Sequence, residues 1–123
     1  MSADRPPGRL RLRVHFAPDI VLGPGKADLL DGIRDTGSIS AAGRRMGMSY
    51  RRAWNLVDTL NRYFRQPVVA TSTGGSGGGG ASLTPFGERM LATYRRIEAR
   101  AADTAADELA WLQAQLHVED AGG

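Results

Sequence analysis

The side chains best suited to binding another molecule stand near the start of one predicted helix. Tyr50, Arg51 and Asn55 lie at spacings that place them on one face of that helix. The opposite face carries Ala53 and Val57, which are apolar and suited to a core. Arginine can donate two hydrogen bonds to guanine, and asparagine can pair in a similar way with adenine. The exposed face is therefore suited to reading base edges in the major groove of DNA.

Other polar residues of the same stretch are suited to phosphate groups. Serine hydroxyls and the amides at a helix start can donate hydrogen bonds to phosphate oxygens, and arginine commonly contacts the DNA backbone. The phosphate contacts that we expect are Ser38, Ser40, Arg44, Arg45, Ser49 and Arg52. Arg62 is also suited to a phosphate, although both it and Arg65 can be explained as solvated charges. Trp54 completes the candidate contacts, but we favour its packing against the first helix or the hairpin.

Positive charge is concentrated in the first half of the chain. Residues 1–65 contain 12 Lys and Arg against 6 Asp and Glu, which gives a net charge of +6. Residues 66–123 contain 4 against 7, which gives −3, so the whole chain carries +3. Asp58 is the single acid between Thr36 and Arg65, where six arginines occur. Such clustering is typical of a protein that binds the phosphate backbone, and a solvated arginine-rich surface is the alternative.

Small residues occur where two short helices would cross and turn. Ala41, Ala42 and Gly43 would let a second helix approach closely, Gly47 suits the turn, and Met48 suits an apolar plug after it. This spacing is typical of a helix-turn-helix. Generic two-helix hairpins can show the same pattern, so the motif is not decisive by itself.

A strand and three helices are predicted before residue 66. Residues 9–16 alternate polar and apolar, which predicts a half-buried strand with leucine, valine and phenylalanine on one face. An aliphatic run at 20–22 ends at a Gly-Pro-Gly break. Gly37 suits a left-handed helix stop, and Ser38 and Ser49 suit N-caps. The helices are predicted over residues 26–35, 38–46 and 49–64.

Two β-type segments, residues 68–72 and 81–84, flank a glycine-rich loop. A P-loop would need a lysine after the glycines, but Lys26 is the only lysine in the chain. A dinucleotide-binding loop would need a helix after it, and a Gly-Ser linker of artificial origin is a third alternative. We favour a hairpin whose bare backbone forms a wing tip that approaches DNA. The wing contacts expected are Gly75, Ser76 and Gly77.

A long helix is predicted after the hairpin. Thr84 suits its N-cap, Pro85 suits its first position, and apolar residues then recur every three or four positions as far as Leu116. A helix of this length extends beyond what one small domain can cover, so we expect its stripe to pair with a second copy. The dimer interface expected is Met90, Leu91, Tyr94, Ile97, Leu109, Leu112 and Leu116.

Composition argues against an enzyme and against a metal site. The chain has no cysteine, so neither a disulfide nor cysteine-ligated zinc is available. His15 and His117 are the only histidines and lie far apart in sequence. No nucleophile has a plausible base beside it, so we expect no catalysis and no cofactor. There is no long apolar run or signal-peptide core, which leads us to expect a cytoplasmic protein.

Taken together, the residues of the helix-turn-helix and of the glycine loop resemble a known family. Residues 37–61 resemble the helix-turn-helix of LysR-type regulators. More specifically, the chain resembles the N-terminal domain of the molybdate-responsive ModE family over residues 23–101. The residues that carry this likeness are Ser49-Tyr50-x-x-Ala53-Trp54 and Thr73-Gly74-Gly75-x-Gly77-Gly78-Gly79-Gly80-Ala81-x-Leu83-Thr84-x-x-Gly87.

The resemblance implies an α+β winged helix-turn-helix, mainly helical, that dimerises and binds a palindromic operator. Its recognition helix would span 49–64 and its wing 73–80. One wing position is often basic in the family, whereas Ser76 is uncharged, which leaves backbone amides and hydroxyls for that contact. The domain organisation expected is a disordered tail at 1–8, the DNA-binding domain at 9–84, the dimerisation helix at 85–117 and a tail at 118–123.

We therefore expect a homodimeric transcription regulator that binds double-stranded DNA and is linked to molybdenum metabolism through the family. Members that sense molybdate have a separate C-terminal oxyanion-binding domain. We expect this chain to be a stand-alone form that does not bind molybdate directly. The alternative is a protein-interaction module that pairs with a full-length regulator and modulates its DNA binding.

Overall fold

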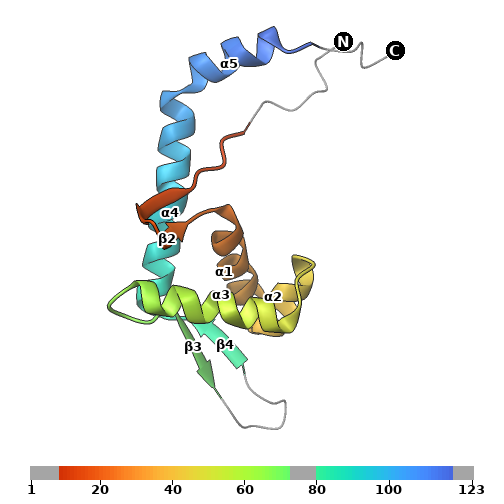
Figure 1. The fold of residues 1–123 in the computed structure, drawn as a ribbon, viewed down its shortest axis with the longest axis vertical. Helices are drawn as coiled ribbons and strands as arrows, with labels where there is room; N and C mark the ends of the chain where they lie inside the picture. The colour runs from red at the N-terminus through yellow and green to blue at the C-terminus, as the bar shows by residue number, and fades with distance from the viewer. Residues whose placement is uncertain (1–8, 73–79, 118–123) are drawn as a thin grey trace.

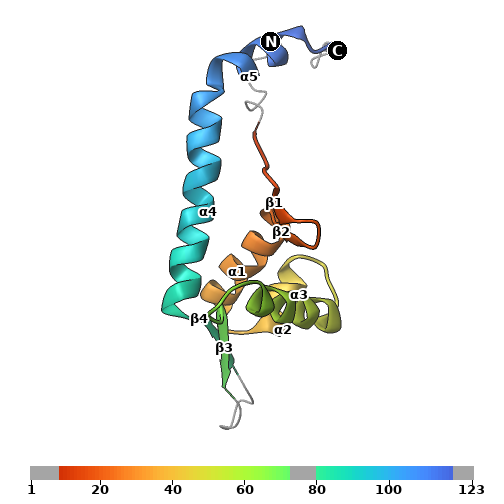
Figure 2. The same ribbon diagram turned by 60° about the vertical axis from the view of Figure 1, so that its left-hand side comes forward.

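Three short helices form a body from which a β-hairpin projects on one side and a long helix departs on the other (Figures 1 and 2). The computed structural model describes residues 9–72 and 80–117. Its elements are β1 (Val14–Ala17), β2 (Ile20–Leu22), α1 (Pro24–Thr36), α2 (Ile39–Arg45), α3 (Tyr50–Tyr63), β3 (Val69–Ser72), β4 (Gly80–Leu83), α4 (Pro85–Thr104) and α5 (Ala106–Gln115). The α+β winged helix-turn-helix predicted from the sequence is confirmed.

Local capping fixes where the helices begin and end. The side chains of Ser38, Ser49 and Thr84 each accept a hydrogen bond from the amide three residues on, at 3.0, 3.1 and 2.9 Å. Each bond satisfies one of the amides that a helix start leaves without a partner. Gly37 and Gly47 have φ of 71° and 70°, a left-handed conformation that favours glycine and stops a helix. The predicted N-caps and stops are confirmed.

The core lies where α1 meets α2, α3 and α4. Its fully enclosed side chains include Leu29, Leu30 and Ile33 from α1, and Leu60 from α3. The burial of apolar surface by these side chains is the main stabilising contribution to the fold. The other buried apolar residues are Leu22, Ala27, Ile39, Ala42, Ala53, Val57, Val68, Val69, Met90, Leu91 and Tyr94.

The N-terminal strand differs from the prediction over residues 9–16. Strand β1 is shorter and pairs antiparallel with β2, so the aliphatic run becomes the second strand of a small hairpin. The pairing register shifts between His15 and Ala17. This irregularity breaks the two-residue alternation, and Phe16, expected on the buried face, is 61% exposed.

The prediction of a single helix over residues 85–117 is wrong. Helix α4 ends at Thr104, Ala105 caps it, and α5 continues in a different direction (Figure 1). The Ala105 amide donates to the carbonyls of both Ala101 and Asp103, which tightens the last turn of α4. Asp103 and Thr104 have low helix propensity, and the acids Asp107 and Glu108 in the first turn of α5 favour a new helix start.

Helix α4 is fastened to α1 by an ionic network. Arg95 donates to carboxylate oxygens of Asp28 at 2.8 Å and Asp31 at 2.6 Å, and to Glu98 at 3.0 Å. Burial lowers the pKa of Arg95, but these three bonds outweigh it and raise the pKa above the ordinary range. Arg95 therefore remains charged and holds the two helices together.

Three residues expected at a dimer interface lie instead in the core of one chain. Met90, Leu91 and Tyr94 are buried, and the Tyr94 hydroxyl donates to the carbonyl of Leu12 at 2.5 Å. Burial, and secondarily the negative charge of Glu98, raises the pKa of Tyr94 from 10.0 to about 12. The hydroxyl thus stays a donor, and these side chains have little surface to offer a second copy.

A glycine allows α4 to start against the hairpin. A Cβ at Gly87 would overlap the Val68 carbonyl. We expect Gly87→Ala to lower the free energy of unfolding by about 1–3 kcal/mol, because the backbone must shift to admit the methyl group. Urea denaturation measures this change.

Gly25→Ala is the matched control, because Gly25 also lies in the first turn of a helix but has no atom within 4 Å of its would-be Cβ. We expect it to leave stability unchanged or to raise it slightly, since alanine favours a helix. Equal destabilisation by both variants would contradict the close contact at Gly87.

Candidate nucleic-acid interface

The crossing of α2 and α3 depends on small residues, as the sequence predicts. A Cβ at Gly43 would lie 2.9 Å from the Cβ of Ala53 on α3. On the other side of α2, a Cβ at Gly32 of α1 would lie 2.9 Å from the Cβ of Ala42, so α2 packs closely against α1 as well. The Met48 amide closes the turn by donating to the Gly43 carbonyl at 3.0 Å. This close approach holds α3 across the body with its outer face free.

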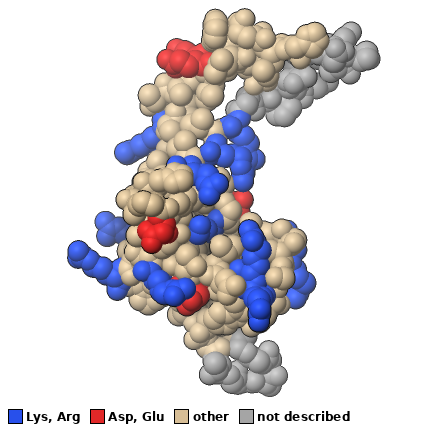
Figure 3. Space-filling model, in the orientation of Figure 1, with Lys and Arg blue, Asp and Glu red and all other residues tan. Residues whose placement is uncertain are grey.

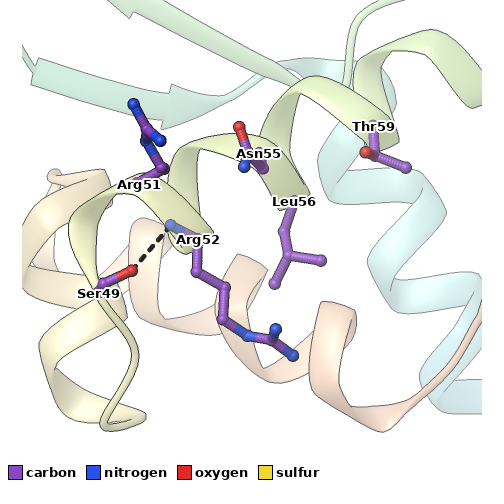
Figure 4. Close-up of a pocket in the computed structure, with 6 residues that line it drawn as sticks. All are labelled: Ser49, Arg51, Arg52, Asn55, Leu56 and Thr59. Atoms are coloured by element: carbon purple, nitrogen blue, oxygen red, sulfur yellow. Dashed lines mark hydrogen bonds between the residues drawn. The ribbon is translucent and has the colours of Figure 1, made fainter.

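The outer face of α3 presents the predicted base-reading residues. Tyr50 is 58% exposed, and Arg51 and Asn55 are also exposed. Arg51 and Arg52 point in opposite directions from the helix, and Asn55 lies on the same side as Arg51 (Figure 4). These residues line a shallow groove of about 300 Å³ together with Ser49, Leu56 and Thr59. The helix start therefore offers hydrogen-bond donors and acceptors to an incoming surface.

A second groove separates α3 from the hairpin. It has a volume of about 310 Å³ and runs between the start of α2, the Tyr50 side of α3 and strands β3 and β4. Trp54 lines it at 37% exposure, and its ring meets that of Tyr50 edge-on with centroids 6.2 Å apart. Trp54 and the hairpin residues thus line one groove, and the packing of Trp54 against the first helix or the hairpin stays a prediction.

The residues predicted to bind phosphate have varied surroundings. Ser38 and Ser49 are N-caps, and the exposed Arg44 donates to the Ser40 hydroxyl at 2.9 Å. Arg45 forms an ion pair with Asp35 at 3.4 Å, so part of its charge is already neutralised. The guanidinium of Arg52 makes no ion pair with any residue between 9 and 72 or 80 and 117. The wing contacts Gly75, Ser76 and Gly77 lie outside the described residues.

Asn61 positions the hairpin, a role that the sequence analysis missed. Its side-chain oxygen accepts hydrogen bonds from the amides of Val68 at 2.7 Å and Val69 at 3.0 Å. Its side-chain nitrogen donates to the Val69 carbonyl at 3.2 Å. The Ala81 amide adds a bond to the Gly37 carbonyl at 2.9 Å. The hairpin is therefore held at a fixed distance from α3.

In the folded chain, positive charge extends beyond the first half of the sequence onto α4 (Figure 3). Lys and Arg side chains are spread over the helical body and along α4, and none is visible on α5 (Figure 3).

Among the described residues, no cluster of three or more acidic or histidine side chains could hold a metal ion. None of the described helices has an apolar stretch long enough to cross a membrane.

With this geometry established, comparison with known proteins gives the family. Residues 27–88, which run from within α1 to the start of α4, match the bacterial regulatory helix-turn-helix proteins of the lysR family. The chain belongs to this family. The resemblance drawn from the helix-turn-helix residues is confirmed.

Three individual relatives show which proteins of known name this chain is similar to. The molybdenum-pterin-binding protein MopB of Rhodobacter capsulatus is 49% identical over 78 residues, which cover 63% of this chain and 29% of MopB. The transcriptional regulator ModE of Yersinia pestis is 40% identical over 88 residues, 69% of this chain and 34% of ModE. The DNA-binding transcriptional dual regulator ModE of Escherichia coli is 36% identical over 88 residues. The chain thus spans about a third of the length of these relatives.

Two asparagines of α3 allow a test of how the hairpin is held. We expect Asn61→Ala to lower the free energy of unfolding by about 1–3 kcal/mol, since it leaves two inward amides without their partner. Asn55→Ala removes an exposed side chain from the same helix and should leave stability within about 0.5 kcal/mol. Urea denaturation of both variants decides this, and an Asn61 variant as stable as the Asn55 variant would refute the role given to Asn61.

Proposed function

We propose that this chain is a transcription regulator that reads a palindromic operator as a homodimer. The observation that carries the proposal is the exposed Tyr50–Arg51–Asn55 face of α3, held outward by the α2–α3 crossing in a chain of the lysR family. An α-helix fits the major groove, where every base pair presents a distinct pattern of donors and acceptors. Arg51 and Asn55 are the residues to which we assign base reading.

Phosphate contacts would fix this helix in register on the duplex. Ser38 and Ser40 at the start of α2 stand beside the groove that faces the hairpin. Arg44 is exposed on the same helix and carries no ion pair with a described residue. Backbone contacts of this kind orient a protein on DNA without carrying sequence information.

The end of the chain supplies the surface that we assign to dimerisation. Ile97 on α4 and Leu112 and Leu116 on α5 are 42%, 56% and 53% exposed. Trp111, which the sequence analysis did not name, is 64% exposed beside them. Leu109 is half-buried on the same helix. A second copy would remove this apolar surface from water, and two-fold symmetry would place the two α3 helices about 34 Å apart, one turn of DNA.

The printed names of the relatives suggest the process that is regulated. MopB is named for molybdenum-pterin binding, and relatives from Azotobacter vinelandii and Herbaspirillum seropedicae are named molybdenum transport proteins. We propose that this chain regulates genes of molybdenum transport or metabolism. We assign no molybdate contact to the described residues. The alternative, a module that acts only by pairing with another regulator, predicts no sequence-specific DNA binding of its own.

Base reading is tested by fluorescence anisotropy on duplexes that the protein selects from a random pool. We expect Arg51→Ala and Asn55→Ala each to weaken binding by about 1–3 kcal/mol and to relax preference at one base pair. Arg100→Ala, on the exposed surface of α4, is the charge-matched control for Arg51→Ala and should bind as the parent does. The proposal is rejected if the parent protein binds the selected duplexes no more tightly than it binds random DNA.

Dimerisation is tested on α5. We expect Leu112→Glu to shift the protein toward monomer in sedimentation equilibrium, because it places a charge in an apolar interface. Gln115→Glu adds the same charge to an exposed position of the same helix and should leave the dimer intact. A parent protein that is monomeric at micromolar concentration would contradict the assembly.

A further inference from the structure

A basic groove lies on the side of α3 away from the hairpin. Its volume is about 490 Å³, and it lies between the N-terminal strand segment, the start of α1 and the inner flank of α3. Four cationic side chains line it, and no acidic residue does. They are Arg11, Arg13, Lys26 and Arg52. The sequence analysis assigned only Arg52 to phosphate binding, because the other three precede the helix-turn-helix.

Internal partners do not account for these charges. Arg11 approaches Asp28 at 3.8 Å, with both side chains nearly half exposed, which is a weak ion pair. The Lys26 ammonium lies 5.8 Å from the centre of the Tyr63 ring. The guanidinium groups of Arg13 and Arg52 have no ion pair within the part of the chain that the structure describes. Four like charges with one weak acidic partner between them favour an anionic occupant.

The groove is continuous with the proposed base-reading surface. Arg52 and Leu56 line both this groove and the one that contains Arg51 and Asn55. Arg52 points away from Arg51 (Figure 4). The same turn of α3 therefore presents Arg51 to the proposed base-reading side and Arg52 to the basic groove. An occupant of the basic groove would therefore be adjacent to whatever lies against α3.

The geometry of the major groove identifies this occupant. The major groove is about 12 Å wide and an α-helix with side chains is about 10–12 Å across, so both phosphate walls lie beside an inserted helix. One wall would meet the start of α2 and the hairpin. The opposite wall would meet the side of α3 that carries Arg52.

We propose that Arg11, Arg13, Lys26 and Arg52 bind the phosphate backbone of this second wall. The proposal rests on the proposed function, since it requires α3 to lie in the major groove. The N-terminal segment and α1 would then contact one DNA strand while the hairpin side contacts the other. The apolar residues Met46, Met48 and Leu56 would form the floor of the groove against the sugars.

The experiment compares the parent protein with Arg13→Ala and with an Arg11→Ala/Arg13→Ala double variant on one selected duplex at several salt concentrations. Each arginine removed should reduce the slope of log affinity against log salt by about 1, with affinity lowered alike on selected and random sequences. Arg13→Lys keeps the charge and should restore the slope. Arg51→Ala, in contrast, should change base preference.

Methylphosphonate substitution locates the contact. Neutral linkages are placed along each strand in turn. Those in the second phosphate wall should weaken DNA binding by the parent protein and have little further effect on DNA binding by the double variant. Urea denaturation confirms that the variants are folded.

Three outcomes separate the two proposals. A parent protein that binds no duplex specifically rejects the proposed function itself. Specific binding whose salt slope and methylphosphonate pattern are unchanged in the double variant overturns the assignment of the groove. Poly-glutamate serves as a probe for an acidic protein partner. If the double variant loses binding to poly-glutamate while its DNA binding is unchanged, the assignment of the groove to DNA is overturned in favour of such a partner.

Discussion

The contact between α2 and α3 is the constraint on which the rest of this structure depends. Gly43 leaves no room for a side chain against Ala53, and Gly32 leaves none against Ala42. Helices α1, α2 and α3 therefore pack with their backbones close together, and their orientation cannot change without a clash. Because the inner face of α3 is fixed in this way, its outer face is fixed as well. The polar side chains of that face are exposed as a result.

A second junction joins this body to its extensions. The segment around Val68 is contacted from two sides. The Val68 amide donates a hydrogen bond to Asn61 of α3, and Gly87 at the start of α4 lies close to the Val68 carbonyl. Arg95 then ties α4 to α1 through Asp28 and Asp31. The hairpin and the long helix are thus both positioned by contacts at the edge of the core, around Val68 and Arg95.

Local signals in the sequence predicted much of this architecture. Caps such as Ser38 and Ser49, stops such as Gly37, and the small residues at the crossing each have a short-range cause that a sequence displays. The exposed face of α3 followed from helical periodicity alone. The DNA contacts of these residues, and the dimer, stay predictions.

Features that depend on distant partners could not be read in the same way. The apolar stripe after the hairpin looks uniform, yet Tyr94 covers the core while Leu112 is exposed, because the body ends before the stripe does. Periodicity does not reveal that boundary, nor the break at Ala105. Asn61 serves backbone groups of the next strand, and only the fold brings them within its reach. The basic groove likewise joins Arg13 to Arg52 across 39 positions of sequence.

Guanine methylation interference on a selected duplex tests the central claim most directly, because methylation at N7 blocks the major-groove edge and leaves the backbone intact. If α3 reads bases in the major groove as one of a symmetric pair, methylated guanines should prevent binding at two clusters about 10–10.5 base pairs apart on one face of the duplex. Binding that is specific yet insensitive to N7 methylation throughout a guanine-containing site would contradict it.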